Sequence, residues 1–292
     1  MTSTLSHAQD AKSLLHAWLA RRLPPDALAW LDQQAAIIEA GDKPLQLGIA
    51  IGLAPRKLGK ADLDLTPAEQ EAGKALRPGL DATGWSVDQA GRILLALSSY
   101  RGDEAAFVAG LATIFGTAEL GEQVALLKGL PLFPAPERLV PYAAEGVRSA
   151  MQPIFEAVAH RNPYPKEHFS DAQWNQMVVK ALFIGSRLAP IQGLDARRNA
   201  ELAQMLIDYA AERRAARRAI SPELWRCVAP FAGEAEVATL ASILRNGTDV
   251  ERKGAALALA DCRPASATET LSSSPDLAAA IQEGRLTWDT VA

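Results

Sequence analysis

The sequence predicts an all-α protein, and three observations support this class. Apolar residues recur at helical spacing, beginning with Leu14, Leu15, Trp18 and Leu19. Helix starts are repeatedly marked by a capping residue that is followed three positions later by Glu or Gln. Alternating apolar runs bounded by hairpin turns are nearly absent, so strands are not expected.

Proline and glycine mark the limits of the first helices. The first apolar face continues to Leu23, and Pro24–Pro25 ends that helix. A second helix is expected over Leu28–Ile38, with Gly41 as its left-handed C-terminal cap. The segment Pro55–Pro67 is rich in Lys, Gly, Asp and Pro, so we interpret it as an exposed connector.

Five further helix starts are predicted from capping chemistry. A Ser or Thr side chain before a helix can accept a hydrogen bond from a backbone N–H that lacks a partner within the helix. These starts are Thr66 with Glu69, Ser86 with Gln89, Ser170 with Gln173, Ser221–Pro222, and Thr248 with Glu251.

Short helices separated by small polar or proline turns predict stacked helix pairs in the middle of the chain. They are expected over 103–115, 120–130, 136–147 and 249–261. The alanine-rich last segment is typical of a HEAT-type repeat, although no fixed period is visible. The predicted fold is a HEAT/armadillo-like α-solenoid. We expect an N-terminal helical region over 1–98, a HEAT-like region over 99–265 and a C-terminal tail over 266–292; alternatively, all three form one domain.

The composition is that of a globular protein, with 49% hydrophobic and 22% charged residues among 292. The net charge of -4 argues against a nucleic-acid partner. No apolar run approaches the roughly 18 residues of a membrane span, and no secretory signal is recognised, so we expect a cytoplasmic protein without direct membrane insertion. Cys227 and Cys262 are interpreted as buried free thiols.

The segment Asn162–Pro163–Tyr164–Pro165 is predicted to be an extended turn, because proline disfavours a helical conformation at the residue before it. Such a rigid turn could present His160 and Tyr164 to a groove. The alternative is a helix-to-helix turn with a packed tyrosine.

The next helix is expected over Asp171–Ile184, and most of its surface is apolar, including Trp174. Asn175 and Lys180 are exceptions, and Asn175 is expected to be half-buried. The polar side chains either line a pocket or form a solvated stripe.

A following helix over Ala196–Arg218 is predicted to start at Asp195 as its N-cap. Arg197 precedes Glu201 by one turn, which favours an ion pair. Asn199 lies in the same first turns of this segment.

Further along, Asp208, Glu212 and Arg213 form a charged group on that helix. One interpretation is a solvated, ion-paired helix. The other places these residues opposite Lys180 across a cleft, where the planar guanidinium of Arg213 would suit a carboxylate or phosphate ligand.

No complete catalytic motif, phosphate loop or zinc motif is recognised, so catalytic residues, metals and cofactors are not expected. The candidate ligand-binding residues share one stretch of chain and polar or aromatic character. They are His160, Asn162, Tyr164, Trp174, Asn175, Lys180, Asp195, Arg197, Asn199, Asp208, Glu212 and Arg213.

Taken together, these motifs resemble the EboA family of metabolite traffic proteins. The resemblance covers mainly residues 160–231 and rests on the 162–165 turn, the string from Trp174 to Phe183, Gly193–Leu194–Asp195, Arg197 with Asn199, 208–213 and 221–226. The chain departs from the family pattern at Ala211, where histidine is common, and at Arg214 and Arg217, where tryptophan and glycine are usual. A histidine-dependent role at this turn is therefore not expected.

The resemblance implies a non-catalytic binding or adaptor protein in the traffic of bacterial secondary-metabolite precursors across the inner membrane. The expected partners are a small metabolite, other proteins of the same pathway, or both. Two alternatives remain open: a pure protein–protein scaffold, and an enzyme of unknown reaction that uses Asp208 and Glu212.

Overall fold

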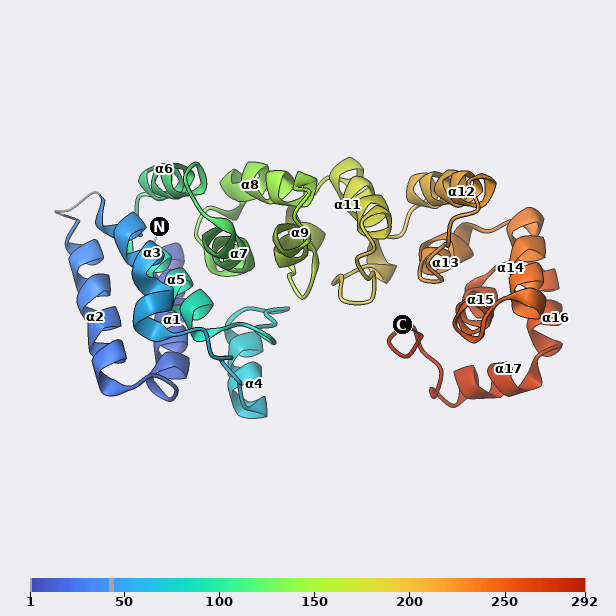
Figure 1. Ribbon diagram of the computed structural model, residues 1–292, viewed down its shortest axis with the longest axis horizontal. Coiled ribbons are helices and arrows are strands. Elements are labelled where there is room, and N and C mark those ends of the chain that lie inside the picture. The colour runs from blue at the N-terminus through green and yellow to red at the C-terminus, as the bar shows by residue number, and fades with distance from the viewer. Residues whose placement is uncertain (1, 42–44, 292) are drawn as a thin grey trace. The chain divides into compact units, whose positions relative to one another are not determined.

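Helices account for all the regular secondary structure of the computed structural model, which describes residues 2–41 and 45–291 (Figure 1). Within these residues no strand occurs, and the only β-type pairing is an isolated antiparallel bridge between Asp62 and Ser86. The predicted all-α class is confirmed. In the same part of the chain, no helix combines the length and apolar character needed to cross a membrane.

The chain divides into two compact units, residues 1–169 and residues 170–292, which we call the N-terminal unit and the C-terminal unit. The expected limits at 98/99 and 265/266 remain a prediction. The helices of the N-terminal unit are α1 (Thr2–Ala20), α2 (Pro25–Ala40), α3 (Gln46–Leu58), α4 (Pro67–Leu76), α5 (Val87–Ser98), α6 (Glu104–Phe115), α7 (Leu120–Lys128), α8 (Pro136–Arg148), α9 (Gln152–Ala159) and α10 (Tyr164–His168), with a 3₁₀ turn over Leu130–Leu132.

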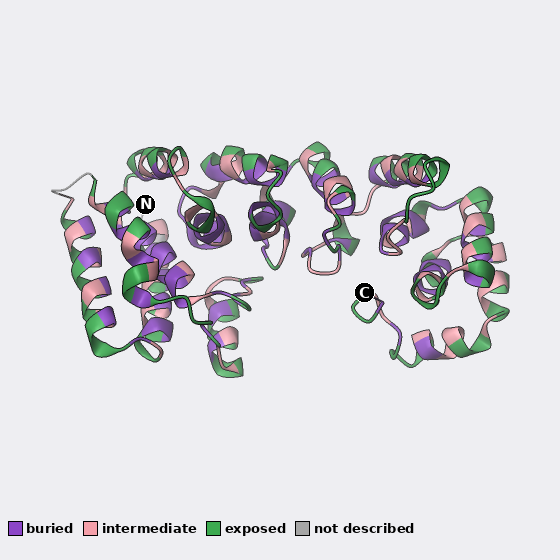
Figure 2. Ribbon diagram, viewed as in Figure 1, coloured by how far each residue is buried: buried purple, intermediate pink, exposed green. Residues whose placement is uncertain are grey.

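Helix α5 forms the centre of the N-terminal unit. It packs against α1, α2, α3 and α7, and every one of its residues except Gln89 is buried (Figure 2). Each buried leucine or isoleucine side chain contributes about 1.5–3 kcal/mol relative to exposure. The core of this unit is therefore built around α5, in which the single half-buried residue is the polar Gln89.

Helix α3 continues through Pro55, so the predicted connector begins later than expected. Proline cannot donate a backbone hydrogen bond to the carbonyl four residues earlier, which here belongs to Ile51. The buried Arg92 fills that position, because its Nε donates to the Ile51 carbonyl at 3.0 Å. Arg92 also pairs with Asp88 at 3.0 Å, which compensates the burial of its charge.

Helices α6 to α10 complete the N-terminal unit. Helix α9 packs on α7 and α8, and the short α10 packs on α8 and α9. The helices predicted over 103–115, 120–130 and 136–147 are confirmed to within a few residues. Asp103 caps α6 by accepting a hydrogen bond from the backbone N–H of Ala106 at 3.0 Å.

The C-terminal unit contains a second set of helices. They are α11 (Asp171–Phe183), α12 (Ala200–Ala215), α13 (Leu224–Val228), α14 (Glu234–Asn246), α15 (Asp249–Asp261), α16 (Ala265–Ser272) and α17 (Pro275–Gln282), with 3₁₀ turns over Asp195–Arg197 and Ala229–Phe231. Helix α12 packs on α11 and α13, and α15 packs on α13, α14, α16 and α17. The predicted helix over 249–261 is confirmed.

Most of the predicted caps are also confirmed. Ser170 accepts a hydrogen bond from Gln173 N at 3.3 Å, and the Thr66 and Thr248 boxes form in the same way. The helix expected after Ser221–Pro222 begins at Leu224. Cys227 is buried as expected, whereas Cys262 is only half-buried; neither forms a disulfide. Burial raises the pKa of Cys227 to about 12 and that of Cys262 to about 11.

Candidate functional site

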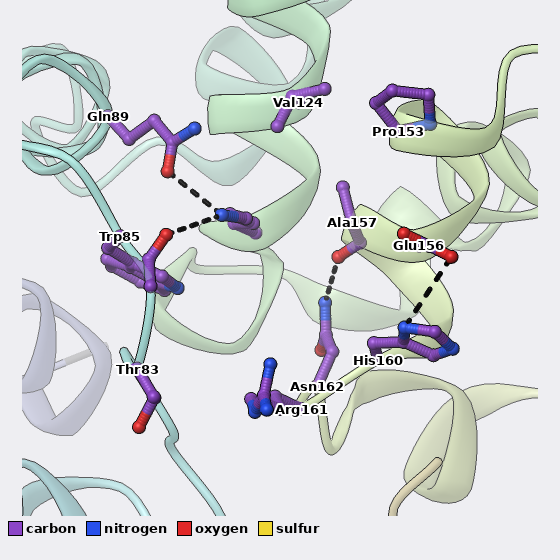
Figure 3. A pocket seen from close by; sticks show the side chains of 12 residues that line it. Thr83, Trp85, Gln89, Val124, Pro153, Glu156, Ala157, His160, Arg161 and Asn162 are labelled. Atoms are coloured by element: carbon purple, nitrogen blue, oxygen red, sulfur yellow. Dashed lines mark hydrogen bonds and ion pairs between the residues drawn. The ribbon is translucent and has the colours of Figure 1, made fainter. Parts of the chain in front are cut away.

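A pocket of about 340 Å³ lies within the N-terminal unit, between the segment before α5, the end of α7 and the turn from α9 to α10 (Figure 3). Its wall on the α5 side comes from Gly84, Trp85 and Gln89. Backbone hydrogen bonds fix this wall, because Trp85 O accepts from Leu63 N at 2.8 Å and Val87 N donates to Ala61 O at 2.9 Å. The wall is therefore preformed.

Lys128, the last residue of α7, brings a half-buried ammonium into this pocket. Its Nζ donates to Gln89 Oε1 at 2.9 Å and to the Gly84 carbonyl at 3.3 Å (Figure 3). Both acceptors are neutral. Burial lowers the pKa of Lys128, the positive charge of Arg161 lowers it further, and Asp88 partly opposes both effects.

Asn162 holds the opposite wall, the turn from α9 to α10. It is buried, and its Nδ2 donates to the Leu127 carbonyl at 3.1 Å and to the Ala157 carbonyl at 3.0 Å. Figure 3 shows the second of these hydrogen bonds. Its Oδ1 accepts from Tyr164 N at 3.0 Å, which forms an Asx turn. One side chain thus ties this turn to both α7 and α9.

The turn held by Asn162 places two basic side chains in the lining of the pocket, His160 and Arg161. His160 Nδ1 lies 4.0 Å from Glu156 Oε1 (Figure 3). Arg161 has a left-handed backbone with φ +51°, an unusual conformation for a residue with a Cβ, and its Nε lies 3.7 Å from Asp81 Oδ2. The lining therefore contains two cationic side chains, Lys128 and Arg161. It also contains one carboxylate, that of Glu156, which lies beside His160.

An extended turn was predicted at Tyr164, and this prediction is wrong. Tyr164 is the first residue of α10. Pro163 is itself helical (φ −73°, ψ −15°), and Pro165 occupies the first turn, where a missing N–H breaks no helical hydrogen bond. The Tyr164 side chain is fully buried, and its hydroxyl donates to the Pro136 carbonyl. Burial raises the pKa of this hydroxyl.

In the C-terminal unit, two predicted residues of α11, Trp174 and Asn175, contact two predicted residues before α12, Arg197 and Asn199. Asn175, which is buried rather than half-buried, and Asn199 exchange two amide hydrogen bonds, of 2.9 and 3.2 Å. The Arg197 guanidinium lies 4.8 Å from the centre of the Trp174 ring and pairs with Asp171 at 2.6 Å. Trp174 is fully buried, and its Nε1 has no acceptor within the described part of the chain.

The predicted N-cap of the following helix is wrong. Asp195 begins a 3₁₀ turn, and α12 starts only after Asn199, whose Oδ1 accepts from Leu202 N at 2.8 Å. The carboxylate of Asp195 binds Arg226 in a two-point contact of 2.8 and 2.7 Å, which lowers the pKa of Asp195. Arg197 lies in this 3₁₀ turn, before α12, and pairs with Asp171.

The other predicted site residues lie on α11 and α12. Lys180 is half-buried on α11, Asp208 accepts from Gln204 at 2.9 Å, and Glu212 is exposed. Arg213 donates two hydrogen bonds to the Ala219 carbonyl, and its guanidinium lies 5.9 Å from the Tyr209 ring centre. Of the twelve predicted residues, only His160 and Asn162 line the pocket of the N-terminal unit.

Sequence reasoning missed Lys128, Gln89, Glu156 and Arg161. Lys128 looks like an ordinary basic residue at a helix C-terminus, where the helix dipole favours it. Arg161 stands between two predicted site residues, so its position in the sequence was the available signal. Among the described residues, no group of three or more His, Cys, Asp or Glu side chains could hold a metal ion.

These features define an all-helical protein with a polar pocket in one unit and a closed polar network in the other. The sequence profile of the family described as "Metabolite traffic protein EboA" matches residues 11–229 of the chain, well over half of its length. The chain belongs to this EboA family. No curated protein and no solved structure matches it.

Proposed function

We propose that this protein is a non-catalytic binding or adaptor protein of metabolite traffic, and that the pocket of the N-terminal unit holds the metabolite. The supporting observation is the Lys128 ammonium, which is half-buried beside neutral oxygens and a second cation, Arg161. The family description supports the traffic role. The ligand in this proposal carries a carboxylate or a phosphate.

Electrostatics favour such a ligand. Removing an ammonium from water is costly unless an opposite charge compensates it, and Asp88, the carboxylate whose charge acts on Lys128, is already paired with Arg92. An anion between Lys128 and Arg161 would supply that charge. The pocket volume of about 340 Å³ falls within the usual range of about 300–1,000 Å³ for small-molecule sites.

Three finer elements of the proposal come from the sequence and from the family resemblance. They are a HEAT-like stacking of helices, a cytoplasmic location, and a role in the export of secondary-metabolite precursors. Consecutive helices that pack on one another within each unit, such as α8 on α9 and α14 on α15, support the first. The predicted residues Trp174, Asn175, Arg197 and Asn199 of the C-terminal unit take a structural role in this proposal, since they bind one another.

The test is native mass spectrometry of the protein purified from its own host. The wild type should carry a bound anion, and Lys128→Met should lose it, because methionine keeps most of the side-chain volume without the charge. The matched control is Lys74→Met, an exposed lysine of the same unit that pairs with Glu71. A metabolite that stays bound to folded Lys128→Met would contradict the proposed site.

A pure scaffold is the second candidate, and one exposed side chain favours it. Phe183, at the end of α11, is 71% exposed, although it belongs to the string that marks the family. A scaffold predicts that Phe183→Ser abolishes the binding of a pathway protein while Lys128→Met leaves it unchanged. The enzyme hypothesis that uses Asp208 and Glu212 remains untested.

A further inference from the structure

The C-terminal end of α12 is closed by a Schellman motif built almost entirely from arginine. Arg218 N donates to the Arg213 carbonyl at 2.8 Å, and Arg217 N donates to the Arg214 carbonyl at 3.0 Å. Arg217 occupies the left-handed position of the motif, with φ +54°, where glycine is usual. The turn therefore has a defined geometry, stabilised further by the two hydrogen bonds from Arg213 to Ala219 O.

This geometry gathers three exposed guanidinium groups around a second pocket. Arg214, Arg217 and Arg218 line a cavity of about 250 Å³ within the C-terminal unit. As far as the structure describes the chain, none of the three makes an ion pair. The one carboxylate in the lining, Glu251, already accepts hydrogen bonds from Thr248 N and Thr248 Oγ1 at 2.8 Å.

The floor of this cavity is apolar and firmly packed. Ile220, Pro222, Trp225 and Ile243 form it, and Trp225 is only 5% exposed. Pro222 lies so close to Gly254 on α15 that a Cβ on Gly254 would meet Pro222 Cβ at 2.5 Å. The floor is thus held between α13, α14 and α15 and is present before any ligand binds.

We infer that this arginine turn is a second binding site, which takes an amphiphilic anion: a phosphate or carboxylate group joined to an aliphatic or aromatic group. The guanidinium groups match the charge and the planar hydrogen-bonding geometry of such a head group. The apolar floor matches the remainder of the ligand. The inference goes beyond the proposed function, because this site lies in the other unit and shares no residue with the Lys128 pocket.

Like charges held together explain why an anion should be needed. Three guanidinium groups that line one cavity with a single carboxylate, Glu251, repel one another, and an anion reduces that repulsion while it gains charge-assisted hydrogen bonds. Inorganic phosphate would satisfy the arginines alone. Phenyl phosphate would also contact the floor, so it should bind more tightly.

The test is isothermal titration calorimetry of the full chain with inorganic phosphate and with phenyl phosphate. We expect phenyl phosphate to bind about tenfold more tightly than inorganic phosphate, since burial of about two methylene-sized groups supplies about 1.4 kcal/mol. The double variant Arg214→Gln/Arg218→Gln should lose at least tenfold in affinity for both. Ile243→Ala should weaken phenyl phosphate only.

Two controls keep the result specific. Arg148→Gln removes an exposed arginine of the N-terminal unit and should change neither affinity at this site. Lys128→Met separates this site from the first pocket, since anion binding at the arginine turn should survive it. Circular dichroism would establish that every variant is folded.

A further arm identifies the source of the anion. Sedimentation with vesicles of phosphatidylglycerol, compared between wild type and the double variant, tests a lipid head group. Binding that depends on the arginines in this arm assigns the site to a membrane lipid, and binding to phenyl phosphate alone assigns it to a soluble molecule. The inference is overturned if the double variant binds phenyl phosphate as tightly as the wild type, or if no arm shows binding.

Discussion

Two buried asparagines, Asn162 and Asn175, come from the same stretch of sequence but belong to opposite kinds of polar site. Asn162 bonds only to backbone atoms, and the turn that it fixes places His160 and Arg161 in a pocket. Asn175 bonds to the side chain of Asn199, whose neighbour Arg197 is held by Trp174 and Asp171. The comparison teaches that a buried polar residue indicates a binding site only when the backbone that it fixes places another polar side chain in a pocket.

The charges of the two regions differ in the same way. In the C-terminal unit, Asp195 and Arg226 compensate one another in a two-point contact. In the N-terminal unit, Lys128 meets neutral acceptors and a second cation, Arg161. A charge without a counter-ion is therefore the feature that separates the pocket from the network.

The largest expected effect comes from Asn162→Ala. It removes three hydrogen bonds and leaves buried carbonyls on Leu127 and Ala157, each of which costs about 1–3 kcal/mol when unpaired. We expect a loss of about 4 kcal/mol in the free energy of unfolding of the N-terminal unit, measured by urea denaturation. Asn162→Asp keeps the acceptor for Tyr164 N but places a carboxylate oxygen, which cannot donate, against the two carbonyls, so it should not recover the loss. A loss below about 1 kcal/mol for alanine would show that this turn is held by other contacts.

A smaller effect is expected from Asn175→Ala. Asn199 loses its amide partner but keeps its cap on α12, so the free energy of unfolding of the C-terminal unit should fall by about 2 kcal/mol. The same urea titration measures it, with the exposed neighbour Gln176→Ala as the control. If folded Asn175→Ala lost anion binding at the Lys128 pocket, the proposed contrast between the open pocket and the closed network would be contradicted, because a closed network should not affect that pocket.

The sequence allowed the helices to be predicted where caps and proline mark their ends, as at Ser170 and Thr248. The prediction from the sequence failed where two local signals favoured different structures. Asp195 and Asn199 are both good N-caps, and the structure uses Asn199 because Asp195 binds Arg226, a partner 31 residues away. Tyr164 was predicted to be extended because Pro165 follows it, yet the Asx turn of Asn162 starts a helix there.

The site was harder to predict than the fold for a related reason. Asn162 and His160 stood out locally, because proline and polar residues interrupt a helical pattern. Lys128 did not, since its partners Gly84 and Gln89 are about forty residues away and its burial depends on α9 and the following turn. An uncompensated charge is a property of the packed structure and has no local sequence signal.

Each unit also contains an arginine in a left-handed conformation. Arg161 lines the Lys128 pocket of the N-terminal unit, and Arg217 lines the arginine-turn cavity of the C-terminal unit. For a residue with a Cβ this conformation costs about 1 kcal/mol relative to glycine. Arg161→Gly and Arg217→Gly should therefore each stabilise the free protein by up to about 1 kcal/mol in thermal unfolding, while each weakens anion binding at its own pocket. Ala135→Gly, also left-handed but buried away from the lining of either pocket, should stabilise without affecting binding. Unchanged binding in Arg161→Gly would remove this arginine from the proposed metabolite site.

The smallest expected effect is the pH dependence of stability due to Lys128. Its pKa in the folded protein is lowered from 10.5, so at intermediate pH the unfolded chain binds more protons at this residue. Below its lowered folded pKa, the buried charge of Lys128 therefore destabilises the folded protein to the full extent. This destabilisation decreases as the pH increases from the folded pKa to 10.5. Other groups titrate in the same range, so the measured quantity is the difference in unfolding free energy between wild type and Lys128→Met at pH 7 and pH 10.5. This difference should shift in favour of the wild type at the higher pH, whereas Lys74→Met should not show such a shift. A difference that moves the other way would mean that the folded protein already supplies Lys128 with an effective counter-charge, and the contrast between the open pocket and the closed network would then disappear.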